Sequence, residues 1–592
     1  MNSVKRICLF ILAILYCSFP IYANDFQADY DTQYAISPNG KTIVTQNVTL
    51  TNKQSNLYPK QYTVTIDSDE IRNVIAYDTK GVITPKVAQK DKKTEIAVSF
   101  NDQVVGIDKK LLFTLRYENG DIAKKLGNIW EVRIPGVTAD STLGEYSVSL
   151  QTPSTFPQNA YMTPLPSTGT RWIKSQLING GINAAYGEFQ SYVVDIVYPL
   201  ENESLTSVVQ TIAIPPDTTY QSVTISEITP KPDEIKKDGD GNWIASFTLS
   251  AGKRVDVKTK LLIKAYIKPL PQSQTPLSDS NLYLKEQPFW ETKNEKIREY
   301  AKKYTTPRAI YDFVTKTLSY NYGQISTTPV RQGSLGAIAS PTNSLCTEFT
   351  DLFIAIARAA GIPAREVVGY AYTNDTRLRP LLVGSDILHA WPEYYDNKSA
   401  RWIPIDPTWG NTTGGINYFD IFDFNHIAFV IHGLSSELPY PAGSFKEGTL
   451  PQKNISVRFS ESTTMVTKDS FTTLFDLPKQ ITAGKILKGT VQVTNIGGKQ
   501  IEKLNVNIVS SPYPFQASDT GSQIPPFGSI SIPVSIKIPI LFHKSQGVIN
   551  VSINGEQATF QFEILPTFWL YGVIGCFALS LILIIWTFIR KT

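Results

Sequence analysis

The stretch 343–365, NSLCTEFTDLFIAIARAAGIPAR, predicts a buried helix that begins at a cysteine. Asn343 and Ser344 are capping residues, and apolar side chains recur at helical spacing until a Gly-Ile-Pro sequence ends the pattern. Cys346 therefore falls in the first turn of the helix. At that position the unpaired backbone N–H groups and the positive end of the helix dipole favour the reactive thiolate over the thiol.

Cys346 is also the only cysteine that the sequence places in the main body of the protein. Of the four cysteines, Cys8 and Cys17 lie in an N-terminal apolar segment and Cys576 lies in a C-terminal one. A lone cysteine in a protein outside the cytoplasm is a buried apolar residue, an intermolecular link or a nucleophile. The position of Cys346 at the start of a helix favours the nucleophile.

Nucleophilic catalysis needs a base that takes the thiol proton and a third group that orients the base. His389 lies in the strand-like segment LHAWPEYY, and Asp406 follows the next apolar segment, WIPI. Two antiparallel strands joined through residues 396–399 would place His389 and Asp406 side by side.

Three motifs follow the cysteine in order: GIPAR at 361–365, HAW at 389–391 and DPTW at 406–409. With the cysteine, they resemble the transglutaminase-like superfamily of papain-type thiol enzymes over about residues 290–433. The resemblance implies an α+β papain-like fold, with Cys346 as nucleophile, His389 as base and Asp406 as orienting acid. It also implies a thioester intermediate, whose acyl group passes to water or to an amine.

Acyl chemistry needs hydrogen-bond donors for the developing oxyanion. The backbone N–H of Cys346 is the natural first donor. The candidates for the second donor, otherwise ordinary loop residues, are Gln332, Asn343 and Tyr322. Glu348 is interpreted as a favourable first-turn charge. Four further polar residues are expected to be structural: Arg358, Arg365, His426 and His432.

Composition excludes several other functions. Without the two basic residues at each end, the 56 Lys and Arg become 52, which equals the 52 Asp and Glu, so nothing indicates a nucleic-acid binder. No zinc spacing or phosphate-binding glycine loop is present, and no metal or cofactor is expected. The sequence DGDGN at 238–242 resembles the start of a calcium loop, but Leu249 replaces its final glutamate, so a hairpin turn is expected.

The two ends of the chain predict secretion and membrane anchorage. Residues 1–23 have the basic start, apolar core and small final residue of a signal peptide. Residues 566–589 carry no charge over roughly 36 Å of helix, enough for a hydrocarbon core of about 30 Å. The basic tail, 590–592, favours a cytoplasmic C-terminus. We therefore expect a single-pass protein of the cell membrane with an extracytoplasmic N-terminal ectodomain.

The length predicts about four folded units at roughly 150 residues each. Changes in periodicity between alternating and helical patterns suggest their limits. The expected parts, in chain order, are an antiparallel β-sandwich at 24–164, a second β-rich domain at 165–269, a linker at 270–289, the transglutaminase-like catalytic domain at 290–433, a linker at 434–454 and an immunoglobulin-like β-sandwich at 455–565.

The leading hypothesis is a multidomain cell-surface thiol enzyme, from a bacterium or archaeon, that forms a thioester on Cys346. Its substrate would be a peptide bond or side-chain amide of a protein or peptide outside the cell. Hydrolysis is slightly favoured over transfer because the sequence identifies no amine-binding site. The alternative is a non-catalytic adhesion or scaffolding protein that uses the transglutaminase-like fold as a binding module. The presence of nucleophile, base and acid together argues against that alternative.

Overall fold

The computed structural model describes residues 25–590, apart from 179, 272–275, 278, 325–329, 374–378, 381, 384–386, 414–416, 446–452 and 462–469. The predicted signal peptide, with Cys8 and Cys17, lies outside the described residues. Contacts between residues divide the chain into two units. The first unit consists of the chain up to Lys124 together with Trp130–Phe156 and Met162–Ala184. The second unit consists of Lys125–Ile129, Pro157–Tyr161 and the chain from Ala185 onward.

The first unit contains a β-sandwich. Its large sheet has β1 (Phe26–Ile36), β2 (Thr42–Asn52), β4 (Ile71–Asp78), β5 (Gly81–Ile83), β8 (Lys110–Asn119), β11 (Leu143–Gln151) and β13 (Arg171–Ile173) in the order β13-β11-β1-β2-β8-β4-β5. Its small sheet has β3 (Gln61–Ile66), β6 (Lys86–Lys90) and β7 (Lys93–Ser99). The Phe113 ring of β8 lies 5.0 Å from the Tyr62 ring of β3, so the two sheets face each other.

Two details of this unit differ from the prediction. Strand β11 pairs with β1 in parallel, whereas an antiparallel sandwich was expected. The unit also extends to Ala184, past the expected boundary at residue 164, because β13 pairs with β11. The remaining elements of this region are α1 (Lys174–Leu177) and a sheet of β9 (Ala123–Leu126), β10 (Ile129–Ile134), β12 (Asn159–Thr163) and β14 (Ile182–Tyr186).

The second unit begins with another pair of sheets. One has β15 (Phe189–Glu201), β17 (Gln221–Thr229), β20 (Arg254–Tyr266) and β26 (Ile455–Ser460), and the other has β16 (Val208–Ile214), β18 (Glu234–Lys237) and β19 (Trp243–Leu249). Alternate residues of these strands are buried around Trp243 and Tyr198. Strand β26 pairs with β15, so residues 455–460, expected to start the C-terminal sandwich, complete this earlier sheet instead.

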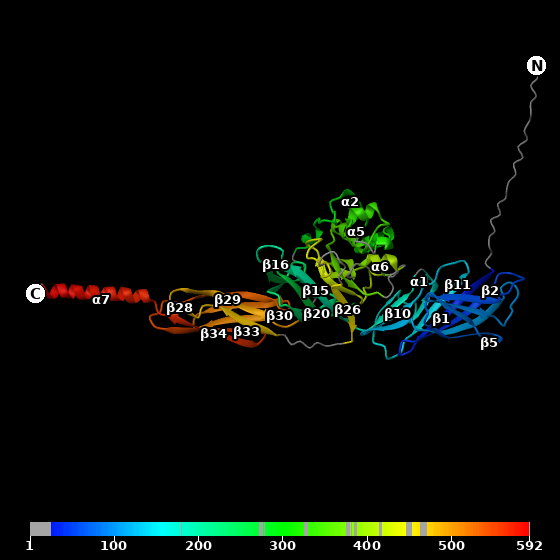
Figure 1. Ribbon diagram of the computed structural model, residues 1–592, viewed down its shortest axis with the longest axis horizontal. Helices are drawn as coiled ribbons and strands as arrows, with labels where there is room; N and C mark the ends of the chain where they lie inside the picture. The colour runs from blue at the N-terminus through cyan, green and yellow to red at the C-terminus, as the bar shows by residue number, and fades with distance from the viewer. Residues whose placement is uncertain are drawn as a thin grey trace, which may run out of the picture. The chain divides into compact units, whose positions relative to one another are not determined.

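The α+β part is inserted between β20 and β26. Its elements are η1 (Ser280–Leu284), α2 (Glu295–Lys303), α3 (Pro307–Thr317), η2 (Tyr322–Gln324), α4 (Gly333–Ala339), α5 (Cys346–Ala359), β21 (Ala364–Ala371), β22 (Leu382–Val383), β23 (Ile387–Asp396), β24 (Arg401–Pro404), α6 (Pro407–Thr412) and β25 (His426–His432). The sheet order is β22-β23-β21-β25, with β24 on β23, and Figure 1 shows α2, α5 and α6 grouped together.

Burial explains how this part is held in place. Phe349, Leu352 and Phe353 of α5 are fully buried, as the helical pattern predicted. Because a buried aromatic or aliphatic side chain contributes about 1.5–3 kcal/mol, α5 is a central element of the core. On the other side of the sheet, Ile427 and Phe429 of β25 enter the same core as Trp243. The α+β part therefore shares its packing with the preceding β-sheets.

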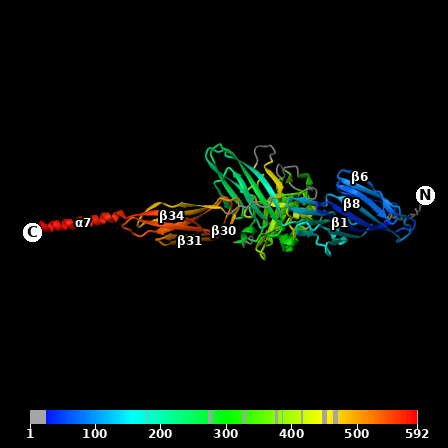
Figure 2. The same cartoon turned by 90° about the horizontal axis from the view of Figure 1, so that it is seen from below.

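The C-terminal part is a sandwich of two sheets. One has β27 (Phe471–Asp476), β29 (Ile486–Asn495) and β32 (Ser529–Lys537), and the other has β28 (Gln480–Thr482), β30 (Ile501–Ser511), β31 (Phe515–Ile524), β33 (Ser545–Ile553) and β34 (Glu556–Leu565). Strands β30, β31 and β34 can be followed in Figure 2. Val491, Ile508 and Val551 lie in its core. Its immunoglobulin-like classification stays a prediction.

The prediction of a transmembrane helix at 566–589 is contradicted by the structure. Helix α7 (Phe568–Ile589) forms at the expected place. However, among the residues that the structure describes, no helix is both long and apolar enough to cross a membrane.

Candidate active site

Cys346 is the first residue of α5 and is completely buried. A carboxylate caps the start of this helix. Glu348 Oε2 accepts hydrogen bonds from the Leu345 N–H (2.9 Å) and the Thr347 hydroxyl (3.0 Å). The other oxygen, Oε1, accepts from the Gln332 N–H at 2.9 Å. Glu348 thus caps the helix and ties it to the preceding loop, as its interpretation as a first-turn charge predicted.

His389 and Asp406 are adjacent, as the expected hairpin required. Strand β23 carries His389 and pairs with β24, which leads to Asp406 at the N-cap of α6. Asp406 Oδ1 accepts from the Trp409 N–H at 3.0 Å, and Oδ2 lies 2.9 Å from His389 Nε2. The cap fixes the carboxylate, and the carboxylate fixes one nitrogen of the imidazole.

Electrostatics favour the charged forms of this pair. Burial opposes a charge on His389, but Asp406 and then Cys346 outweigh it and raise the pKa of His389 to about 9. Burial likewise opposes a charge on Asp406, yet His389 and His426 hold the pKa of Asp406 well below its usual range. The buried pair is therefore an imidazolium and a carboxylate at neutral pH.

The contact between Cys346 and His389 is less well defined than the hydrogen bond between His389 and Asp406. His389 Nδ1, the nitrogen that does not face Asp406, has no hydrogen-bond partner among the described residues. Cys346 is near enough to contribute to the raised pKa of His389. The structure thus brings the three predicted residues together, with a 2.9 Å hydrogen bond between His389 and Asp406 and with Cys346 close enough to raise the pKa of His389.

His426, which was expected to be structural, belongs to the same cluster. Its Nε2 lies 3.3 Å from Asp406 Oδ2, and its Nδ1 lies 2.7 Å from Asp423 Oδ1. The pairing of β25 with β21 brings it here, opposite Ala371. Because this pairing joins segments far apart in the sequence, no local pattern could have revealed it. Asp423, three residues earlier, was the one available signal.

The candidates for a second oxyanion donor are otherwise engaged. Gln332 Nε2 donates to the Asn343 carbonyl at 3.0 Å, and the Asn343 side-chain oxygen accepts from Asn321 and Gln324. Tyr322 is 47% exposed. None of these side chains is placed as a buried donor.

Tyr320 is a donor that sequence reasoning missed. It is buried, it pairs with Ser344 in an isolated parallel bridge, and its hydroxyl has no hydrogen-bond partner within the described chain. Burial, followed by the nearby Cys346, raises the pKa of Tyr320 far above its ordinary value, so the hydroxyl keeps its proton. A buried polar group without a partner is costly, which makes this one a candidate ligand contact.

The two arginines are structural, as expected. Arg358 donates to the carbonyls of Ala364 and Gly433 at 2.9 and 2.8 Å, and the Arg365 Nε donates to Glu393 at 2.7 Å. The expected hairpin turn at 238–242 also forms, since the Asp238 carboxylate accepts from the Asn242 N–H at 2.8 Å.

Three side chains of the site could approach a metal ion. One donor atom each from His389, Asp406 and His426 lie within 4.8 Å of one another. These imidazole–carboxylate contacts have the lengths of hydrogen bonds, which satisfy the same atoms. We therefore assign no metal to them.

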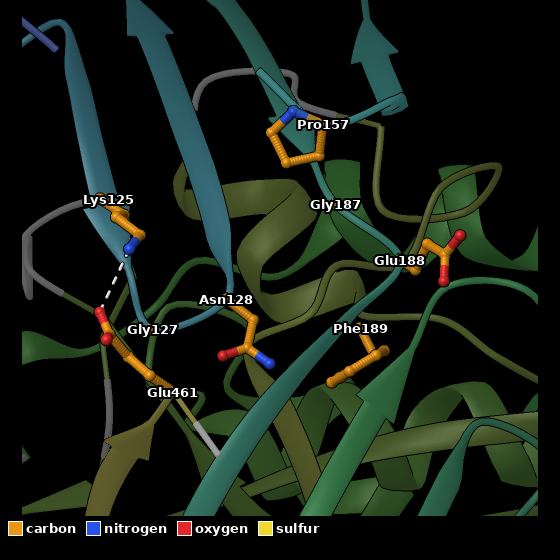
Figure 3. Close-up of a pocket in the computed structure, with 8 residues that line it drawn as sticks. All are labelled: Lys125, Gly127, Asn128, Pro157, Gly187, Glu188, Phe189 and Glu461. Carbon is orange, nitrogen blue, oxygen red and sulfur yellow. Dashed lines mark hydrogen bonds and ion pairs between the residues drawn. The ribbon is translucent and has the colours of Figure 1, made fainter. Parts of the chain in front are cut away.

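A surface pocket of about 390 Å³ lies elsewhere in the second unit (Figure 3). An ion pair of 3.2 Å between Lys125 and Glu461 closes one side, and Phe189 contributes an apolar wall. None of the predicted catalytic residues lines this pocket. The candidate site thus consists of the buried cluster and not of this opening.

Comparison with solved structures gives weak likenesses. A candidate cysteine protease from Cytophaga hutchinsonii is 17% identical, with a TM-score of 0.27, over 46% of this chain and 98% of its own. The CARDB domain of a Pyrococcus furiosus protein, solved with di-metal ions, is 16% identical, with a TM-score of 0.15, over 16% of this chain and 89% of its own. A β-glucosidase from Listeria innocua is 15% identical, with a TM-score of 0.13, over 16% of each chain.

No curated protein matches the chain. A family model does: residues 291–407 match the transglutaminase-like superfamily. The match covers α5 and the residues from Cys346 to Asp406, the segment in which the sequence motifs were recognised. The chain thus carries a transglutaminase-like superfamily domain at residues 291–407.

Proposed function

We propose that the protein is a thiol enzyme that forms a thioester between Cys346 and the acyl group of a peptide or side-chain amide. The observation that carries this proposal is the buried 2.9 Å hydrogen bond between His389 and Asp406, beside the cysteine that begins α5. A histidine oriented by a carboxylate and set beside a thiol is the arrangement that nucleophilic catalysis uses.

The residues have the following roles in the proposal. In the reactive state His389 has already taken the proton of the Cys346 thiol at Nδ1, and the resulting thiolate attacks the carbonyl carbon of the amide. The Cys346 N–H, which helix α5 leaves unused, and the Tyr320 hydroxyl donate hydrogen bonds to the resulting oxyanion. His389 then gives its proton to the departing amine as the C–N bond breaks. Asp406 holds the imidazole in orientation throughout.

The thioester is then consumed by water or by an amine. His389 takes a proton from the attacking nucleophile, the C–S bond breaks, and the proton returns to the thiolate of Cys346. We favour hydrolysis of a protein or peptide outside the cytoplasm because no amine-binding site can be identified in the sequence. Secretion itself rests on residues 1–23, which the structure does not describe.

The alternative, a non-catalytic adhesion or scaffolding module, has one specific observation in its favour. Cys346 is 0% exposed and His389 is 1% exposed, so the described chain leaves no open path to the thiol. A binding module needs no such path. An enzyme must open the site before its substrate can reach the sulfur.

Thiol labelling combined with turnover tests the proposal. The full chain is treated with iodoacetamide, and alkylation of the peptide that contains Cys346 is quantified by mass spectrometry. Turnover is measured on a peptide library with and without a small primary amine, which separates hydrolysis from transfer. C346A should abolish turnover, whereas C576A, which removes the exposed cysteine, should retain it. Turnover that survives in C346A would reject the mechanism.

A further inference from the structure

A second histidine contacts the same carboxylate oxygen of Asp406 as His389 does. Both ring nitrogens of His426 face carboxylate oxygens, Nε2 facing Asp406 at 3.3 Å and Nδ1 facing Asp423 at 2.7 Å. A neutral imidazole carries a proton on only one nitrogen, so both contacts are hydrogen bonds only if His426 is an imidazolium. The geometry therefore places a positive charge in contact with Asp406.

The surroundings of His426 suit a cation. The ring is buried, and the ring centroids of Trp409 and Phe422 lie 4.5 and 4.4 Å from its own centroid. Aromatic faces attract cations in this way.

The charged groups around this ring come from four elements. They are Asp406 at the start of α6, Asp423 before β25, His389 on β23 and Arg379, whose guanidinium lies over the Trp409 ring and acts on Asp423. The partner of His426 on β21 is Ala371, which has no charge.

We propose that His426, held by Asp423, is a positioning residue that anchors Asp406 and sets the pH range in which Cys346 is reactive. The proposal rests on the proposed function, because it assumes that Cys346 and His389 are the reacting groups. Asp406 Oδ2 is shared by both histidines, whose ring centroids are 5.5 Å apart. Asp423, His426, Asp406 and His389 thus form one buried chain of hydrogen bonds.

The direction of the effect follows from the charge. A fixed positive charge on His426 attracts the negative charge that the Cys346 sulfur carries after it has given its proton to His389, which favours the reactive form. The same charge disfavours a second proton on His389, so the imidazolium that donates to the leaving group is lost at lower pH. Removing the His426 charge should therefore move both limbs of the activity profile to higher pH.

The chain provides a matched control in His432. Its Nδ1 faces Glu366 at 2.8 Å and its Nε2 faces the Pro439 carbonyl at 2.8 Å, so it too is a buried imidazolium. Unlike His426, it forms its hydrogen bonds with groups other than Asp406 among the described residues. A loss of stability would follow from substituting either histidine, whereas a change in the reactivity of Cys346 should follow only from H426Q.

The experiment measures the rate at which iodoacetamide alkylates Cys346, across pH, in the full-length wild type, H426Q and H432Q. H426Q should raise the midpoint of the rate profile by about one unit, which is about a tenfold slower reaction below the midpoint. H432Q should leave the midpoint unchanged. An unchanged midpoint in H426Q, or an equal shift in H432Q, overturns the proposal.

A second measurement on the wild type decides the case if H426Q does not fold. The chain has four histidines, so ring-labelled histidine NMR signals can be assigned with single variants of the others. His426 should remain doubly protonated from about pH 5 to 8. A neutral His426 at pH 7 would refute the proposal. Failure of the proposed function is a different result, since it appears as absent turnover in the wild type while these two readouts remain measurable.

Discussion

Glu348 is predicted to hold the start of α5, so replacing it with alanine should loosen the helix that carries Cys346. The side chain is 2% exposed and accepts three hydrogen bonds, from the Leu345 N–H, the Thr347 hydroxyl and the Gln332 N–H. E348A removes all three acceptor contacts. It also leaves the two backbone N–H groups without a partner in a place that water does not reach freely.

The size of the effect can be worked from these contacts. Each stranded backbone donor costs about 1–3 kcal/mol, so the two together give about 4 kcal/mol as a central value. At about 1.4 kcal/mol per factor of ten, this corresponds to roughly a thousandfold increase in local opening. E348Q keeps the shape and one acceptor oxygen, so its cost should be about 1–1.5 kcal/mol, or roughly tenfold.

Hydrogen exchange followed by mass spectrometry measures this opening. Peptides that cover 343–360 should exchange faster in E348A and less so in E348Q. Peptides from β30, in the separate core of the C-terminal sandwich, serve as the internal control and should not change. The reasoning fails if exchange in 343–360 changes by less than about threefold in E348A, since even about 1 kcal/mol predicts more.

Three further outcomes are expected. Y320F should lower kcat by roughly 10- to 100-fold with little change in KM, because it removes an oxyanion donor, while Y322F should stay near wild type in the same peptide assay. R331M should destabilise the α+β part by about 3–5 kcal/mol in denaturant unfolding, because it removes the cation that two buried carboxylates, Asp351 and Glu366, share, and a smaller loss would contradict that role. The pKa values of His389 and His426 are raised from 6.5 to about 9 in the folded protein, so protonation of these two histidines stabilises the fold. This stabilisation is complete below pH 6.5 and is lost as the pH rises through 9, so the melting temperature should fall across this window.

Local patterns predicted the elements that carry the proposed chemistry. The helical spacing after Cys346 predicted α5, and the expected hairpin between the HAW and DPTW motifs predicted the contact between His389 and Asp406. Both features depend on neighbours within a few tens of residues. Period-two alternation likewise identified strands such as β8, in which alternate residues are buried.

Long-range pairing accounts for what the sequence did not reveal. His426 reaches the site only because β25 lies on β21, and the Tyr320 hydroxyl is significant only because folding leaves it buried without a partner. The role of β26 is similar, since nothing in ISVRFS identifies β15 as its partner. Hydropathy alone also overstated the C-terminal helix, which the described residues do not support as a membrane span.

The return of β26 to β15 has a consequence for how the chain is made. Asp195 on β15 and Arg458 on β26, which pair at 2.6 Å, are 263 residues apart. At roughly 5–20 residues per second, about 13 to 50 s pass between the synthesis of one strand and of the other. During that time the edge of β15 is an unpaired template for another strand. The nascent chain therefore needs protection until residue 460 has emerged, and a fragment that stops before residue 455 should aggregate through this edge.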